Sequence, residues 1–328
     1  MKREQERFIE ATNRWSVAQA KPYWYVACLS KELKSKPLSI RIWDTPIVLF
    51  RDEQGIPRAL LDRCSHRNVP LSLGSCVKGG IQCPYHGWEF DGKGHCRKIP
   101  ALVGEPESSA RNIPSFPVRE QQDHVWIFSS FKEEPNHEPF SFPNKEDSNY
   151  TSILYQAEFD ASIHASAENI LDVPHTAFLH KGLFRGEKRN RVQTKISRYP
   201  DRVICQYIGE PRPSGLVGRI LAPKGGEVEH WDRFLLPSIA QVQYKLEDRE
   251  VIISNALTPL SDFKTKIYTV VTVKLKIWSW LLRPIVLPFA LRILEQDVQM
   301  LKHQLSSLRE FQGEDYSKMR PKINHRMM

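Results

Sequence analysis

The stretch CPYHGWEFDG, residues 83–92, places a cysteine and a histidine three positions apart and a glycine directly after the histidine. This spacing is typical of two metal ligands in one loop. It also fits a buried cysteine beside an ordinary loop histidine, because an unmodified cysteine packs as a small apolar residue. If a metal binds here, other parts of the chain must supply further ligands.

A second cysteine–histidine pair lies upstream in CSHR, where one residue separates Cys64 from His66. Together with Cys83 and His86 this pair could hold a tetrahedral zinc ion. The same four residues could hold a [2Fe–2S] cluster, with two cysteines on one iron and two histidines on the other. The short spacing in CSHR favours the cluster, since zinc loops usually separate their ligands by two to four residues.

The distribution of apolar runs predicts an α+β protein of 328 residues. Short runs separated by Gly, Pro and polar turns are typical of a small all-β domain. Longer strand-like runs, flanked by helical patterns near 165–180 and 291–310, indicate a mixed second domain. The expected segments are an N-terminal helical segment (1–19), the β domain (20–131), a polar linker (132–149) and the second domain (150–328).

Charge and cysteine usage limit the partners and the setting. The N-terminus lacks the apolar core of a signal peptide, and six scattered cysteines do not suggest a disulfide scaffold, so we expect a cytoplasmic protein. The net charge is +9, and residues 181–202 hold eight basic and two acidic residues. This stretch predicts a solvated face or a docking site for an acidic protein. Nucleic acid is not expected, because no recognition motif accompanies the charge.

Residues 277–294, IWSWLLRPIVLPFALRIL, are largely apolar but contain Arg283 and Arg292. Pro284 and Pro288 interrupt the run, which makes it a poor membrane span. We expect a buried segment that leads into a helix. The alternative is a patch at a pocket mouth or a peripheral membrane contact, which the tryptophans and arginines would suit.

A second group of histidines lies in ENILDVPHTAFLH, residues 168–180. His175 and His180 would lie about 140° apart on a regular helix, which does not suit two ligands of one metal. Pro174 should kink or restart the helix, because it lacks a backbone N–H and clashes with the preceding turn. From the spacing alone, two histidines packed in a core remain the alternative.

The two cysteine–histidine loops, CSHRNVPLSLGSC and CPYHGWEFDGKG, resemble the cluster-binding loops of Rieske proteins, including the Gly-Trp after the last histidine. Rieske proteins of respiratory complexes carry an extra, disulfide-forming cysteine in each loop. The matching positions here are Val69 and Tyr85. The resemblance therefore implies the oxygenase form, with Cys64, His66, Cys83 and His86 as cluster ligands. Cys76 and Cys96 are then structural.

The motif Asn169-x2-Asp172-x2-His175-x4-His180 resembles the mononuclear iron motif in the α subunits of Rieske non-haem iron oxygenases. That family completes the site with a carboxylate from a late helix, and the candidate is Asp297. It lies about 60° from the centre of the apolar stripe expected in 291–308, against about 100° for Glu295. The resemblance implies a 2-His-1-carboxylate triad that leaves open positions on the iron. A solvated carboxylate at the helix edge is the alternative for Asp297.

The family implies a Rieske β-domain followed by a helix-grip (START-like) domain, in which a curved antiparallel sheet wraps around a long helix. It also implies a terminal oxygenase that takes electrons from a separate ferredoxin or reductase, and the chain has no GxGxxG fingerprint of its own. The length and loops most resemble vanillate and dicamba O-demethylases, pheophorbide and chlorophyllide oxygenases, and cholesterol desaturases.

These members favour hydroxylation or oxidative demethylation of an apolar ring compound. cis-Dihydroxylation and desaturation are the alternatives within the family. A Rieske electron-transfer protein with a non-catalytic second domain is the alternative from another class.

Asp172 and Asn169, the remaining polar residues of the motif, are the candidate catalytic residues outside the ligand set. Asp172 precedes His175 by three residues, so its carboxylate is within reach of the imidazole N–H. The resemblance also implies that it bridges to His86, or to His66, of the next subunit in a head-to-tail homotrimer. The alternative is that Asp172 caps the helix restarting near Pro174.

Overall fold

The computed structural model describes residues 19–100, 102–180, 192–209, 228–246, 249–274 and 279–311. Apart from Gln19, the expected N-terminal helical segment lies outside the described residues, and so do residues 181–191 of the basic stretch. The chain forms two compact units. The first comprises Gln19–Ser141 and Thr258–Ser261. The second comprises the described residues from Phe142 to Leu257 and from Asp262 onward, so the stretch expected as a linker is divided between the units.

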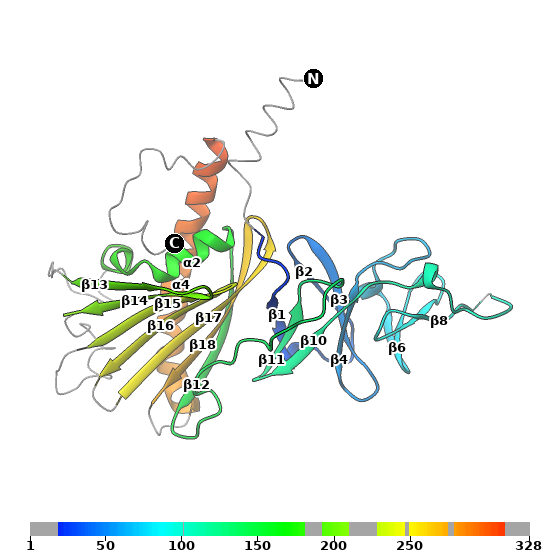
Figure 1. Ribbon diagram of the computed structural model, residues 1–328, viewed down its shortest axis with the longest axis horizontal. Helices are drawn as coiled ribbons and strands as arrows, with labels where there is room; N and C mark the ends of the chain where they lie inside the picture. The colour runs from blue at the N-terminus through cyan, green and yellow to red at the C-terminus, as the bar shows by residue number, and fades with distance from the viewer. Residues whose placement is uncertain are drawn as a thin grey trace. The chain divides into compact units, whose positions relative to one another are not determined.

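The first unit is built from three antiparallel sheets (Figure 1). One has the order β1(Trp24–Leu29)–β11(His124–Phe128)–β10(Val118–Gln121). The second has the order β2(Leu38–Ile42)–β3(Thr45–Arg51)–β4(Pro57–Leu61)–β9(Ser115–Phe116). The third has the order β5(Ser75–Val77)–β6(Gly80–Gln82)–β7(Glu89–Asp91)–β8(Cys96–Lys98). Short 3-10 turns lie at η1(Ser30–Glu32), η2(Leu71–Leu73) and η3(Ser109–Arg111). This is the all-β domain predicted from the sequence.

The core of the first unit joins the second and third sheets beneath the two cysteine–histidine loops. Phe50 of β3, Leu60 of β4 and Phe90 of β7 are at most 1% exposed and belong to one apolar cluster. The same cluster includes Cys64 and Cys83. Burial of this apolar surface is the main term that stabilises the unit, and it fixes the base of both loops.

The second unit is a seven-stranded antiparallel sheet with helices (Figure 1). Its strand order is β12–β18–β17–β16–β15–β14–β13. The strands are β12(Thr151–Phe159), β13(Gln193–Arg198), β14(Arg202–Ile208), β15(Glu229–Leu235), β16(Ile239–Leu246), β17(Arg249–Ser261) and β18(Lys264–Val273). The long antiparallel sheet and its helices agree with the fold expected for the second domain.

The helices of this unit are α2(Ile163–Leu171), the 3-10 turn η4(Val173–Ala177) and α4(Ser279–Glu310). α2 packs against β15, β16, β18 and α4, and α4 packs against β12. The Oγ of Ser162 caps the start of α2 by accepting a hydrogen bond from the Ala165 N–H at 3.1 Å. The interruption predicted near Pro174 is confirmed, since the α-helix ends at Leu171 and a 3-10 turn follows.

The structure corrects the prediction for residues 277–294. From Ser279 onward the stretch belongs to α4, and Pro284 and Pro288 lie inside this helix instead of ending it. Each proline removes one backbone hydrogen bond, but the other bonds of a 32-residue helix continue through them. Both prolines are exposed, so their rings do not have to fit into the core.

Among the described residues, none of the helices combines the length and apolarity that a membrane-crossing segment needs. Ile277 and Trp278, at the start of the apolar run, lie outside the described residues.

A glycine in the turn between β7 and β8 offers a test of the first unit. Gly94 has φ +81°, and a Cβ added there would lie 2.0 Å from the backbone oxygen of Ile113. Gly55 has a similar φ of +76°, but nothing lies within 4 Å of its added Cβ. We expect Gly55→Ala to cost about 1–2 kcal/mol of stability through left-handed backbone strain alone. Gly94→Ala should cost about 1–3 kcal/mol more, because the Ile113 backbone has to move. Urea unfolding of both variants measures the difference, and equal losses would contradict this account.

Candidate metal sites

The two cysteine–histidine loops of the first unit have the same kind of backbone turn. In the first loop, the Cys64 oxygen accepts from the Asn68 N–H, and the Cys64 N–H donates to Val69. In the second loop, the Cys83 oxygen accepts from the Gly87 N–H, and the Cys83 N–H donates to the Trp88 oxygen. Asn68 and Gly87 both have positive φ, 63° and 70°, a conformation that Asn and Gly adopt most easily. The repeated turn holds the cysteine of each loop in the same backbone position, whereas the histidine follows two residues later in the first loop and three in the second.

The loops bring two thiols and two imidazoles together. Cys64 and Cys83 are 1% and 3% exposed. Burial raises the pKa of the Cys64 thiol to about 11, and the neighbouring Cys83 thiol adds to this shift. The rings of His66 and His86 lie 4.6 Å apart, between centroids, and His86 is exposed. Two neighbouring buried thiols and two neighbouring imidazoles are the donor set expected for a cluster with two cysteines on one iron and two histidines on the other.

His66 gives a further test of fit. Its ring stacks on Trp88 with a 4.7 Å centroid separation and a 2° angle. Its Nδ1 is buried, and it has no hydrogen-bond partner in the part of the chain that the structure describes. Buried nitrogen atoms are rarely left without a partner. A metal at this position would satisfy it, so the residues present fit the cluster.

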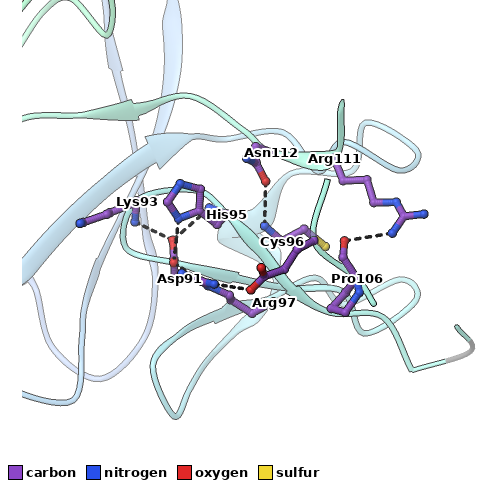
Figure 2. Close-up of polar contacts among 9 residues, drawn as sticks. Asp91, Lys93, His95, Cys96, Arg97, Pro106, Arg111 and Asn112 are labelled. Atoms are coloured by element: carbon purple, nitrogen blue, oxygen red, sulfur yellow. Dashed lines mark hydrogen bonds and ion pairs between the residues drawn. The ribbon is translucent and has the colours of Figure 1, made fainter. Parts of the chain in front are cut away.

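The first loop is tied by a side-chain hydrogen bond to the segment of Arg111 and Asn112, and Figure 2 shows the bonds from this segment to Pro106 and Cys96. Ser65, between the two ligands of this loop, donates from Oγ to the backbone oxygen of Arg111 at 2.6 Å. The Arg111 guanidinium donates to the backbone oxygen of Pro106 at 2.9 Å. Asn112 Oδ1 accepts from the backbone N–H of Cys96 in β8 at 3.2 Å. These bonds hold the loop against β8.

Asp91 organises the turn between β7 and β8 (Figure 2). Its carboxylate accepts from the backbone N–H groups of Lys93 and His95, from Arg97 Nε at 2.8 Å, and faces His95 Nδ1 at 3.1 Å. Burial would raise the pKa of Asp91, but the hydrogen bonds from His95 and Arg97 lower it below its usual value. The carboxylate therefore stays ionised and keeps this turn in place at neutral pH.

The second group of candidate ligands converges in the second unit. The Nε2 atoms of His175 and His180 lie 3.2 Å apart. Asp297 Oδ1 lies 3.6 Å from His175 Nε2 and 3.2 Å from His180 Nε2. One ligand atom from each of the three residues lies within 4.8 Å of the others. Among the described residues, these two histidines and one aspartate form the group of side chains that could share one metal ion.

The break at Pro174 explains how two histidines five positions apart can meet. His175 lies in η4, and its backbone oxygen accepts from the N–H groups of both Phe178 and Leu179. The chain therefore turns tightly before His180, and the angular separation of a regular helix does not apply. Asp297 is 8% exposed whereas Glu295 is exposed, in agreement with the inward position predicted for Asp297.

The electrostatics of this group suit a divalent metal. Burial would raise the pKa of Asp297, but the hydrogen bonds to His175 and His180 lower it below its usual value. Burial would lower the pKa of His180, but its contacts with Asp297 and Gln296 raise it. An ionised carboxylate and two imidazole nitrogens that face one point are the ligands of non-haem Fe(II) sites. The residues present therefore fit a mononuclear iron.

Two more residues contact the ligands. Asn169 Nδ2 donates to Asp297 Oδ1 at 3.3 Å, so the motif residue predicted from the sequence does contact the site. Gln296 Oε1 lies 2.8 Å from His180 Nδ1. The sequence analysis did not identify Gln296, and its position beside Asp297 was the only signal that could have pointed to it.

Asp172 occupies the junction between α2 and η4. It stands at the N-cap of η4 but makes no capping hydrogen bond with its side chain, which is contrary to the capping alternative. The prediction that its carboxylate accepts the His175 ring N–H is also not met. His175 Nδ1 contacts the Asp172 backbone oxygen instead, and the nearest carboxylate oxygen is 3.8 Å away. Burial raises the pKa of Asp172, and its Oδ1 is buried without a hydrogen-bond partner among the residues described.

Two family models match the chain. The Rieske [2Fe-2S] domain matches residues 23–117, and the vanillate O-demethylase oxygenase C-terminal domain matches residues 159–325. The first range contains both cysteine–histidine loops, and the second contains the His175, His180 and Asp297 group.

Curated relatives cover parts of the chain. It is 33% identical over 213 residues to the oxygenase component of dicamba O-demethylase from Stenotrophomonas maltophilia, which is 64% of this chain and 62% of that protein. It is 30% identical over 235 residues to the chloroplastic protein TIC 55 of Arabidopsis thaliana, 69% of this chain and 41% of that protein. The matched part thus spans less than two thirds of these relatives.

A solved structure shares the fold over almost the full length. The crystal structure of dicamba monooxygenase bound to dicamba superposes with a TM-score of 0.78 at 24% identity, covering 95% of this chain and 96% of the other. The fold is shared, and the two matched domains of this chain contain the two groups of candidate ligands. The chain belongs to the Rieske oxygenase family whose second domain is of the vanillate O-demethylase type.

Proposed function

We propose that the protein is the terminal oxygenase of a Rieske system, which hydroxylates or oxidatively demethylates an apolar ring compound with O₂. The observation that carries this proposal is the convergence of His175, His180 and Asp297. A Rieske protein that only transfers electrons would not need a second, buried 2-His-1-carboxylate group. This argues against the electron-carrier alternative.

In this proposal each unit holds one metal group. Cys64 and Cys83 bind one iron of a [2Fe–2S] cluster, and His66 and His86 bind the other. The mixed ligands give such clusters a higher reduction potential than all-cysteine ones, and Fe(II) in a 2-His-1-carboxylate site supplies the chemistry of O₂ activation.

The surrounding side chains orient the iron ligands. The backbone oxygen of Asp172 accepts the Nδ1 proton of His175, which leaves Nε2 to face the metal. Asn169 donates to Asp297 and restricts the rotation of its carboxylate. Three protein ligands on one face would leave the opposite positions of the iron open for O₂ and for water, and substrate would sit nearby without binding the metal.

The sheet of the second unit supports an apolar substrate. Residues of β12, β17 and β18 form an apolar cluster that includes Ile153, Val251 and Val271. Tyr155 borders this cluster, and burial, followed by the charge of Asp297, raises its pKa to about 12. α4, which carries Asp297, packs against β12, the strand that contains Ile153 and Tyr155. Relatives are named for dicamba, for chlorophyllide a and for a 4β-methylsterol, all of which are ring compounds.

The remaining expectations about partners and setting belong to this proposal. The dicamba relative is named as an oxygenase component, which supports a separate ferredoxin or reductase as electron donor. A cytoplasmic setting is supported by the scattered cysteines, all six of which are free. A homotrimer, with Asp172 against His86 or His66 of the next subunit, is supported by the Asp172 side chain, which is 30% exposed and so accessible to a neighbouring chain.

The substrate class is tested by O₂ uptake. The reconstituted protein, supplied with a reductase and NADH, should consume O₂ in step with product formation when it is given apolar ring compounds with methoxy or methyl groups. Uptake coupled to a small, highly charged acid, with all such ring compounds inert, would contradict the proposal.

The metal assignment is tested by iron content. The wild-type protein should hold about three irons per chain, two in the cluster and one in the mononuclear site. His175→Ala, His180→Ala and Asp297→Ala should each lose about one iron and all oxygenation. They should keep the reduced-cluster EPR signal, because the two groups of ligands lie in different units.

His303→Ala is the matched control, because His303 is an exposed histidine on the same helix as Asp297. It should keep about three irons per chain. Loss of the cluster signal in His175→Ala would be contrary to the two-site assignment.

The role of Asp172 is tested by Asp172→Asn. The amide removes the negative charge of the group that would accept a hydrogen bond from a cluster histidine of the next subunit. Both metals and the trimer should remain, but reduction of the iron by the cluster should slow by roughly tenfold or more, as measured by rapid mixing with the reduced protein. Asp201→Asn, at an exposed aspartate, is the control. A fully active monomer, or an Asp172→Asn protein reduced at the wild-type rate, would show the assignment to be wrong.

A further inference from the structure

The two histidines of the candidate iron site are held by different kinds of group. Each directs Nε2 at Asp297, so each must carry its proton on Nδ1 to bind a metal. For His175, the acceptor of that proton is the backbone oxygen of Asp172. For His180, the acceptor is a side chain, Gln296 Oε1, at 2.8 Å.

Gln296 lies next to two of the candidate ligands, His180 and Asp297. It directly precedes Asp297 on α4, so this helix supplies one ligand and the acceptor that orients another. The His180 side chain is only 1% exposed, which leaves little access for a water molecule to replace the amide oxygen. Without Gln296, the Nδ1 proton of His180 would lose its acceptor, and the ring could rotate or change tautomer.

The lack of charge on the Gln296 side chain also affects the iron site. A glutamate at this position could accept the same proton, but it would add a second negative charge beside the ionised Asp297. Charges in a buried site interact strongly. An extra negative charge would stabilise the ferric state more than the ferrous state and would lower the reduction potential of the iron.

We propose that Gln296 is a positioning residue of the mononuclear iron site, which fixes the tautomer and orientation of His180 while its neutral amide keeps the iron easily reduced. This inference rests on the proposed function, because it assumes an iron that the cluster must reduce. Gln296 lies outside the ligand set, and its acceptor oxygen and its lack of charge have separate effects on the site.

Two substitutions separate these claims. Gln296→Met has a similar length but no acceptor oxygen, so it removes the hydrogen bond. Gln296→Glu keeps an acceptor and adds the charge. Glu295→Gln is the control, because it changes the charge of an exposed neighbour on the same helix. All are made in the full chain with the cluster in place.

Orientation is measured with Co(II), which replaces Fe(II) and reports binding through its visible absorption. The mononuclear site is first emptied under anaerobic conditions, and the cluster absorption shows that each variant is folded. Gln296→Met should weaken Co(II) binding by about 10–100-fold, as is usual when a partner of a metal-bound histidine is removed. Gln296→Glu should bind at least as tightly as the wild type, and Glu295→Gln should match it.

Charge is measured by redox titration of the mononuclear iron. Gln296→Glu should show a lower Fe(III)/Fe(II) potential and slower iron reduction by the cluster, whereas Glu295→Gln should change neither. Wild-type Co(II) affinity in Gln296→Met, or an unchanged potential in Gln296→Glu, would overturn the inference. If Gln296→Met does not fold, the test rests on Gln296→Glu. Weak Co(II) binding or an unchanged potential in that variant would overturn the inference.

These outcomes differ from a failure of the proposed function. A wild-type protein that binds neither Co(II) nor Fe(II) at this site would overturn both. Wild-type binding and turnover, together with unaffected Gln296 variants, would overturn only the role of Gln296.

Discussion

Pro174 has no backbone N–H to donate, and the candidate iron site depends on this missing donor. A continuous helix through residues 163–180 would put His175 and His180 about 140° apart. Instead α2 ends at Leu171 and the chain continues as a 3-10 turn. The turn frees the backbone oxygen of Asp172, which then accepts from His175, and it brings the two Nε2 atoms to 3.2 Å. The same interruption therefore places the ligands and fixes the tautomer of one of them.

The carboxylate of the site comes from a distant part of the chain, on α4. Packing of α4 against β12 and α2 brings Asp297 and Gln296 to the histidines. Helical geometry explains why the apolar stripe of 291–308 identified Asp297 as the inward acid. The stripe could not show that the helix begins at Ser279, because local rules treat Pro284 and Pro288 as breaks. In the structure the helix continues through both prolines, which lie on its exposed side.

The ligands themselves were accessible from the sequence, and most of the residues that hold them were not. The cysteine–histidine loops are local motifs, and their repeated turn requires a left-handed residue four positions after each cysteine, which Asn68 and Gly87 supply. By contrast, Ser65 is tied to Arg111, and His180 to Gln296, through tertiary contacts between distant segments. No spacing rule predicts such pairs. The contact of His175 with the Asp172 backbone oxygen, where a carboxylate was expected, is local, but it depends on the 3-10 turn, which the spacing did not specify.

The difference between a main-chain and a side-chain acceptor has a consequence for how such a site can vary. Substitution of Asp172 leaves its backbone oxygen in place, so the orientation of His175 depends on the turn and not on the residue type. The acceptor for His180 can change with a single side chain. The basicity of one ligand and the charge beside the iron can therefore be adjusted through α4 alone, without a change to any ligand. With the role proposed for Gln296, a change at position 296 would alter the affinity for the metal and the charge beside it while every ligand stays the same.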